Sequence, residues 1–286
     1  MDTSRIVFTW AFFGVLFFAL AQEKKTIVLT DLDLDRSNPA GFVEMHFPSA
    51  SDTLQGLMYR ANGDGAHPTL ILLHGYPGNE RNLDLAQVVR SKGWHVIYFN
   101  YRGAWGSQGD FSFKNCVEDV VNVVNYCQQH ADQFGIDHEK IVLFGHSMGG
   151  FVTLKALQQL PTIKKGFVLS AWDIGGTFEK KTKPEELNGL IKKYGIDYFV
   201  LNTPSKEIFQ PVLEDSKYFD LSKDGKSLSE KELMMLDEHN KNEHIADALS
   251  VKNTAYFDYQ VWDTDHSFTN KRVSLMNAVL DFLQKP

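Results

Sequence analysis

The hexapeptide Gly-His-Ser-Met-Gly-Gly at residues 145–150 has a spacing that suggests covalent chemistry. Its first five residues form G-x-S-x-G around Ser147, with a strand-like run at 140–144 before it and a helix-like run at 151–160 after it. In that setting the motif is a nucleophile elbow, a strained turn that lifts the serine hydroxyl above a sheet. The glycines let the strand and the helix pass each other closely. The alternative is a glycine-rich turn with an incidental serine.

A serine hydroxyl needs a base, and the base needs an orienting acid. Behind such an elbow the chain order is serine, acid, histidine. His266 fits the base, because it lies in the loop between the last strand-like run and the last helix-like run. His239 and His244 also follow Ser147, but we expect them in a loop and a helix, respectively.

The acid is expected just after the strand that precedes the last one. Asp237 ends that strand and is the predicted acid, with Glu238 as its neighbour. Asp173 ends the preceding strand and is an alternative position for the acid. Asp263 and Asp265 stand too close to the histidine in sequence to be favoured.

An oxyanion hole requires backbone donors aimed at the tetrahedral oxygen. We predict the N–H groups of Met148, directly after the nucleophile, and of Tyr76, in the loop His74-Gly-Tyr-Pro-Gly. The Tyr76 ring is a candidate for the acyl pocket, and His146 is a further candidate for substrate contact. His74 is expected to be a structural loop residue.

The apolar residues of the rest of the sequence predict the strands and helices that would position these residues. Strand-like runs occur at 42–47, 54–60, 69–73, 95–99, 140–144, 166–170, 232–236 and 255–262. Helix-like patterns occur at 82–92, 116–130, 148–160 and 269–283. This alternation predicts an α/β fold with a mostly parallel eight-stranded sheet flanked by helices. The early strands have no helices between them, so they should form an antiparallel edge.

Composition limits the class of protein. The 286 residues are 43% hydrophobic and 23% charged, with a net charge of −7. These values are typical of a globular chain and exclude a disordered, collagen-like or coiled-coil one. An acidic chain without a basic run is a poor candidate for nucleic-acid binding.

The pattern of the first 21 residues predicts a signal peptide rather than a part of the fold. An apolar run at 6–21 is shorter than the ~20 residues of a membrane span and ends in Ala-Leu-Ala. We expect residues 22–286 to form a single exported domain, periplasmic or secreted, with no membrane contact after cleavage. The alternative is an uncleaved anchor. Residues 174–227 interrupt the alternation and are expected to form a cap-like insertion.

Cys116 and Cys127 lie in one predicted helix. Eleven residues at ~1.5 Å rise separate them by roughly 16 Å, beyond the ~7 Å reach of a disulfide. We predict two free, mostly buried thiols, and no metal site.

Four segments together resemble the α/β-hydrolase superfamily: LLHGYPGNERN, FNYRGAWGSQGDFSF, VLFGHSMGG and DHSF. The nearest branch is similar to dienelactone hydrolases and prolyl-oligopeptidase-type serine peptidases, and the resemblance covers about residues 42–286. It implies that the loop from Tyr101 to Gly109 borders the active site, that Trp105 rims the pocket, and that Arg102 forms a structural ion pair. Dienelactone hydrolases carry cysteine where Ser147 stands, which argues against that activity.

The predicted reaction is hydrolysis of an ester-type acyl bond by Ser147, His266 and Asp237, without a cofactor or metal. The expected partner is a small molecule or a short peptide. An aminopeptidase or amidase is the first alternative and predicts that Glu179, Glu185 or Glu186 grips a substrate ammonium group. A non-catalytic binding protein is the second, and it has no need of the three residues together.

Overall fold

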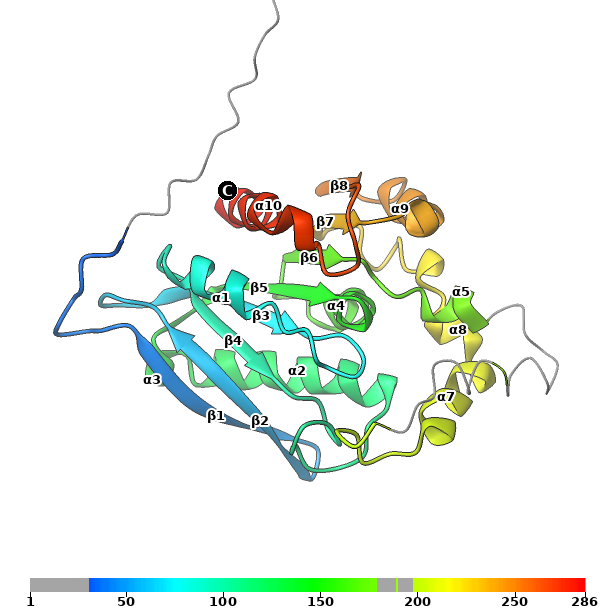
Figure 1. Ribbon diagram of the computed structural model, residues 1–286, viewed down its shortest axis with the longest axis horizontal. Coiled ribbons are helices and arrows are strands. Elements are labelled where there is room, and N and C mark those ends of the chain that lie inside the picture. The colour runs from blue at the N-terminus through cyan, green and yellow to red at the C-terminus, as the bar shows by residue number, and fades with distance from the viewer. Residues whose placement is uncertain (1–30, 179–188, 190–197, 286) are drawn as a thin grey trace, which may run out of the picture. The chain divides into compact units, whose positions relative to one another are not determined.

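The computed structural model describes residues 31–178, 189 and 198–285. Their centre is an eight-stranded sheet in the order β1-β2-β4-β3-β5-β6-β7-β8 (Figure 1). The strands are β1 (Gly41–Ser49), β2 (Asp52–Arg60), β3 (His67–Leu73), β4 (His95–Phe99), β5 (Ile136–His146), β6 (Lys165–Leu169), β7 (Glu232–Asp237) and β8 (Tyr256–Val261). Each strand overlaps one of the eight predicted runs, and the predicted α/β class is confirmed.

The strand pairing follows the hydrophobic pattern. β1 alternates between buried and more exposed residues and pairs antiparallel with β2, which pairs antiparallel with β4. From β4 through β3, β5, β6 and β7 to β8 every pairing is parallel. The predicted antiparallel edge is therefore confirmed. Because the carboxyl ends of parallel strands meet along one edge, the loops after β3, β5, β6, β7 and β8 converge there.

Helices cover both faces of the sheet (Figure 1). α1 (Leu83–Arg90) and α10 (Arg272–Gln284) lie on one face, and α2 (Phe113–Gln129) and α4 (Met148–Gln159) pack against each other on the opposite face. The other described helices are α3 (Ala131–Phe134), α5 (Ile174–Phe178), α7 (Ser205–Glu214), α8 (Ser216–Phe219) and α9 (Glu243–Ser250), with short 3-10 turns η1 (Leu221–Lys223), η2 (Asn240–Asn242) and η3 (Thr269–Lys271). No described helix is long and apolar enough to cross a bilayer.

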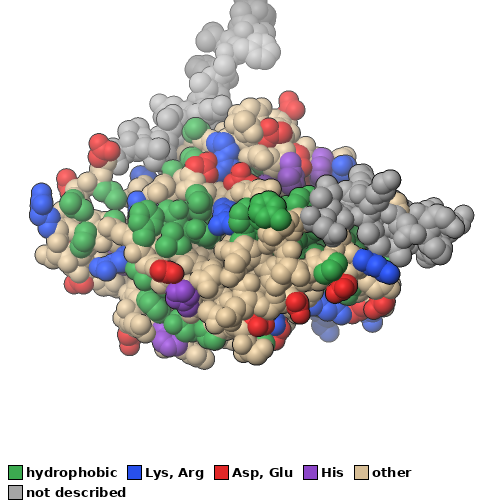
Figure 2. Space-filling model, turned by 60° about the horizontal axis from the view of Figure 1, so that its bottom comes forward, with side chains coloured by type: hydrophobic (Ala, Val, Ile, Leu, Met, Phe, Trp, Pro, Cys, Tyr) green, Lys and Arg blue, Asp and Glu red, His purple; other side chains and the backbone are tan. Residues whose placement is uncertain are grey.

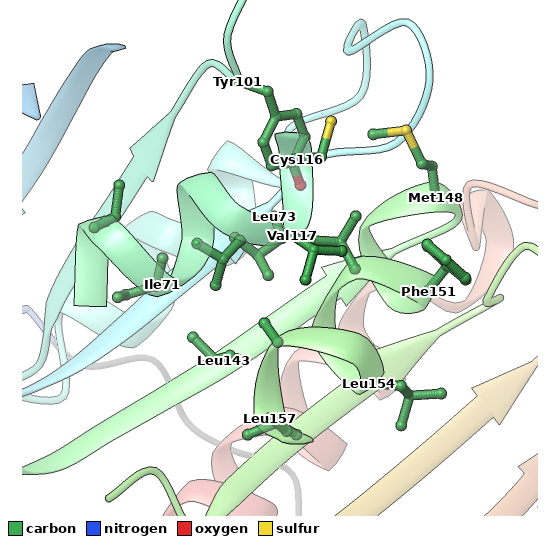
Figure 3. Packing of buried hydrophobic residues seen from close by; sticks show 14 of the residues in the cluster. Ile71, Leu73, Tyr101, Cys116, Val117, Leu143, Met148, Phe151, Leu154 and Leu157 are labelled. Atoms are coloured by element: carbon green, nitrogen blue, oxygen red, sulfur yellow. The ribbon is translucent and has the colours of Figure 1, made fainter. Parts of the chain in front are cut away.

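The core lies between α2, α4 and the sheet (Figure 3). Val117 of α2, Leu143 of β5 and Leu154 of α4 belong to this buried cluster. Cys116 and Cys127 are buried there as free thiols, as predicted. Burial raises the pKa of Cys127 to about 12, which keeps its thiol protonated.

A buried ion pair ties α2 to the loop after β4. Arg102 Nε lies 2.6 Å from Oδ1 of the fully buried Asp119, and a second nitrogen of Arg102 pairs with Glu118. The structural ion pair expected of Arg102 is confirmed. On the surface, acidic and basic side chains are interspersed over the visible face (Figure 2).

The segment between β6 and β7 carries α5, α7, α8 and η1. Phe219 of α8 stacks on Phe151 of α4, with ring centroids 5.6 Å apart, so this segment packs on the helix behind the elbow. Glu179, Glu185 and Glu186 lie outside the described residues, as does the predicted signal peptide.

Candidate active site

Ser147 stands between β5 and α4 with φ 60° and ψ −119°. This backbone conformation is disfavoured for a non-glycine residue and persists only where the surroundings enforce it. A Cβ on Gly145 would lie 2.0 Å from the carbonyl oxygen of Gly149, and one on Gly149 would lie 2.0 Å from that of Leu73. The strand and helix therefore cross at a distance that only glycine permits, as the motif predicts.

Hydrogen bonds hold the elbow against the end of β6. The Ser147 N–H donates to the Leu169 carbonyl oxygen at 2.8 Å, and the Trp172 N–H donates to the Ser147 carbonyl oxygen at 2.9 Å. These bonds fix the serine relative to the residues that follow β6.

His266 lies in the loop between β8 and α10, and its acid partner is Glu238. His266 Nδ1 is 2.8 Å from Glu238 Oε1, and the hydroxyl of Ser170 donates to Oε2. Burial would raise the pKa of Glu238, but the hydrogen bonds from His266 and Ser170 outweigh it and lower this pKa to about 2. The carboxylate is therefore ionised at any physiological pH.

Asp237, the predicted acid, makes no hydrogen bond to His266 in the described structure, and Glu238 makes that bond instead. Asp237 is the last residue of β7, is completely buried, and accepts a hydrogen bond of 3.3 Å from Asn242 Nδ2. Successive side chains of a strand emerge on opposite faces, so the following residue, Glu238, reaches the histidine instead. Burial raises the pKa of Asp237 to about 7.

Ser147 and His266 line one cavity of about 530 Å³. His266 is exposed over 54% of its side chain, and no hydrogen bond between the described residues joins it to Ser147 Oγ. Proton transfer needs the two groups within ~3 Å, and such bonds commonly tighten when substrate binds.

The loop after β3 lies against Ser147. A Cβ on Gly75 would lie 3.0 Å from Ser147 Cβ. Met148 begins α4, where the first N–H groups lack intrahelical partners. Tyr76 lines the cavity, and its ring is 5.5 Å from that of Tyr198 and 6.2 Å from that of Trp172.

Two residues predicted to contact substrate lie elsewhere. His146 is buried, and its Nε2 donates to the His266 carbonyl oxygen at 2.8 Å, so it supports the His266 loop rather than lining the cavity. Burial lowers the pKa of His146 to about 4. The Trp105 indole N–H donates to the Pro77 carbonyl oxygen at 2.8 Å, and this ring borders a different depression, beside Phe199. Their side-chain directions were not evident from sequence spacing.

Most of the cavity wall was not predicted. The further lining residues are Ser170, Ala171, Trp172, Asp173, Gly176, Thr177, Tyr198, His239, Lys241 and Asn242. The stretch after β6 could have been found from its position at the carboxyl end of a parallel strand, where ligands bind in open α/β sheets. Tyr198 had no such signal. No cluster of three or more metal-ligating side chains occurs among the described residues.

The fold and this site define an α/β-hydrolase. The family model BD-FAE matches residues 57–253, more than half of the chain, so the protein belongs to the BD-FAE family. The lysophosphatidylserine lipase ABHD12 of Danio rerio is 24% identical over 261 residues, covering 80% of this chain and 61% of that protein. In Gallus gallus the protein of the same name is 28% identical over 98 residues, 33% of this chain and 24% of its own length. The chain thus spans less than two thirds of these relatives.

Solved structures share the fold. The Pyrococcus furiosus esterase Pf2001 has a TM-score of 0.62 at 17% identity, covering 86% of this chain and 90% of its own. The acylaminoacyl peptidase of Pyrococcus horikoshii has a TM-score of 0.66 at 16% identity, covering 86% and 42%. Together with the family match, these likenesses place the protein in the α/β-hydrolase fold.

Proposed function

We propose that the protein hydrolyses carboxylic esters of small or medium size through Ser147, His266 and Glu238. The observation that carries this proposal is the strained serine in a cavity that also contains a histidine hydrogen-bonded to an ionised carboxylate. That set is the minimum that a serine nucleophile requires.

In the proposed reaction His266 Nε2 takes the proton of Ser147 as Oγ attacks the ester carbonyl carbon. The oxyanion receives hydrogen bonds from the N–H groups of Met148 and Tyr76. His266 then returns the proton to the leaving alcohol, and the same cycle with water releases the acid. Glu238 holds Nδ1 protonated and stabilises the imidazolium.

The cavity supports an ester with an apolar acyl or alcohol part. Its volume of about 530 Å³ lies within the ~300–1,000 Å³ range of small-molecule sites. Tyr76, Trp172 and Tyr198 supply an aromatic wall. The relatives named as esterases and lipases agree with this substrate class.

An aminopeptidase or amidase is the second candidate, because Asp173 lines the same cavity and offers a carboxylate to a substrate ammonium group. Both Asp173 oxygens already have partners, however. Oδ1 accepts from the Gly176 N–H at 2.9 Å, and Oδ2 lies 3.5 Å from His244 Nε2. We therefore favour the ester.

The test is labelling with a fluorophosphonate, followed by assays with p-nitrophenyl esters and aminoacyl p-nitroanilides. We expect labelling of the parent and of the control Ser250→Ala, whose serine is exposed at the end of α9, but not of Ser147→Ala. Faster turnover of anilides would favour the amidase. A folded parent that neither labels nor turns over substrate would refute the proposal and leave a binding protein.

We also propose export. The apolar run at 6–21 and its Ala-Leu-Ala ending support a cleavable signal peptide. Expression of the full chain in bacteria, with fractionation and N-terminal sequencing, should give an exported protein that begins near Gln22. A cytoplasmic protein with an intact N-terminus would contradict this.

A further inference from the structure

The Glu238 carboxylate is held from two sides. Oε1 faces His266 Nδ1 at 2.8 Å, while Oε2 accepts from the hydroxyl of Ser170. The Glu238 side chain is only 12% exposed, so water contributes little to its position. His239 Nε2 is 3.6 Å from Oε1, outside hydrogen-bonding distance. The serine hydroxyl thus donates to the oxygen that the histidine leaves open.

The backbone of Ser170 is itself strained. Its φ of 45° lies in the left-handed region, which is uncommon for serine, and the residue is 2% exposed. The Ser170 N–H donates to the Leu236 carbonyl oxygen at 2.8 Å, which anchors it to β7 next to the acid. Strain of this kind persists where the surroundings over-determine it, and it clusters at functional sites.

We propose that Ser170 is a positioning residue, whose hydroxyl orients Glu238 so that Oε1 points at His266. This inference rests on the proposed function. The hydroxyl also withdraws negative charge from the carboxylate, and this moderates the basicity that Glu238 confers on the imidazole.

Removing the hydroxyl should therefore change both rate and pH dependence. In Ser170→Ala we expect kcat to fall about 10- to 100-fold, the loss of one hydrogen bond to a charged group, with KM changed less than about 2-fold. More negative charge then remains on Glu238 and favours the imidazolium, so the acidic limb of the kcat profile should move to higher pH. The charged and titratable groups that face this pair are His239 and Asp237 at Glu238, and His146 and Asp237 at His266.

A double-mutant cycle separates positioning from other roles, because Ser170 also lines the cavity. In a Glu238→Gln background, Ser170→Ala should change kcat less than about 2-fold. A full-sized effect there would overturn the proposal, since Ser170 would then act on substrate or on the fold. An unchanged rate and acidic limb in Ser170→Ala alone would also overturn it.

A second variant, Ser170→Gly, separates loss of the hydroxyl from any folding defect of Ser170→Ala. Glycine lacks the hydroxyl but accepts φ 45° without strain, so it should fold at least as stably as the alanine variant. Both variants should show the same kinetic defect. A defect in alanine that glycine repairs would assign the effect to backbone strain and refute the role of the hydroxyl. If the parent neither labels with fluorophosphonate nor hydrolyses esters, the proposed function itself has failed, whereas an active parent with unaffected variants refutes only the positioning role.

Discussion

The adjacent carboxylates Asp237 and Glu238 should respond in opposite ways to neutralisation. Glu238→Gln preserves the shape of the side chain but removes the charge that holds His266 Nδ1 protonated. We expect kcat to fall about 10⁴-fold, as when the acid of such a triad is replaced by its amide. Asp237→Asn should leave kcat within about 3-fold, because Asp237 accepts from Asn242 and makes no hydrogen bond to the histidine.

Asp237→Asn should instead change stability, and the sign follows from its pKa. In the folded protein this pKa is raised from 3.8 to about 7, so folding favours the protonated acid. The parent therefore loses stability as the pH rises from about 4 to about 7, and the loss persists above that. The shift of about three pKa units corresponds to up to about 4 kcal/mol. Asparagine cannot ionise and keeps an oxygen acceptor for Asn242.

The assay is urea unfolding of parent and variant at pH 4.5, 6 and 8, alongside ester hydrolysis. The stability of Asp237→Asn relative to the parent should rise steadily across this range, by a few kcal/mol. A relative stability independent of pH would refute the buried, proton-retaining role of Asp237. Loss of kcat in Asp237→Asn together with an active Glu238→Gln would show that the acid is Asp237 after all.

Two further substitutions test the packing that supports the site. Gly149→Ala places a methyl group 2.0 Å from the Leu73 carbonyl oxygen, so it should lower the unfolding free energy by at least about 3 kcal/mol and abolish esterase activity. In the control Gly41→Ala the new methyl group meets nothing within 4 Å, and the unfolding free energy should change by less than about 0.5 kcal/mol. Equal effects of the two substitutions would contradict the close crossing of strand and helix. Arg102→Met leaves the buried Asp119 carboxylate without its guanidinium partner and should lower the unfolding free energy by about 3–5 kcal/mol in urea titrations. The double variant Arg102→Met with Asp119→Leu should recover part of this loss. A double variant no more stable than Arg102→Met would refute the unpaired charge as the cause.

Local residue patterns in the sequence were sufficient to predict the strands of the sheet and the elbow at Ser147. Alternating and continuous apolar runs predicted all eight strands, because burial on one or both faces of a sheet dictates residue type directly. The elbow could also be predicted from the sequence, because its geometry admits only glycine at two positions around Ser147. His266 could be placed in the cavity loop because chain order and parallel strands bring the loop after β8 beside the loop after β5.

Side-chain direction after a strand ends was decided by the tertiary structure. Asp237 and Glu238 are one residue apart, and the alternation of the strand sends the first into the core and the second to His266. Likewise His146, adjacent to Ser147 in sequence, has a buried side chain that donates to the His266 carbonyl oxygen.

The cavity wall depended on tertiary structure for a different reason. Trp172 and Tyr198 lie 26 residues apart in the segment between β6 and β7, and Lys241 follows β7. They meet at one cavity only because these parts of the chain pack together. Contacts between segments far apart in the chain depend on how whole elements pack, and no local spacing encodes them. The sequence by itself therefore determined the class of fold and the position of the elbow serine, whereas packing decided which carboxylate meets His266 and which residues line the cavity.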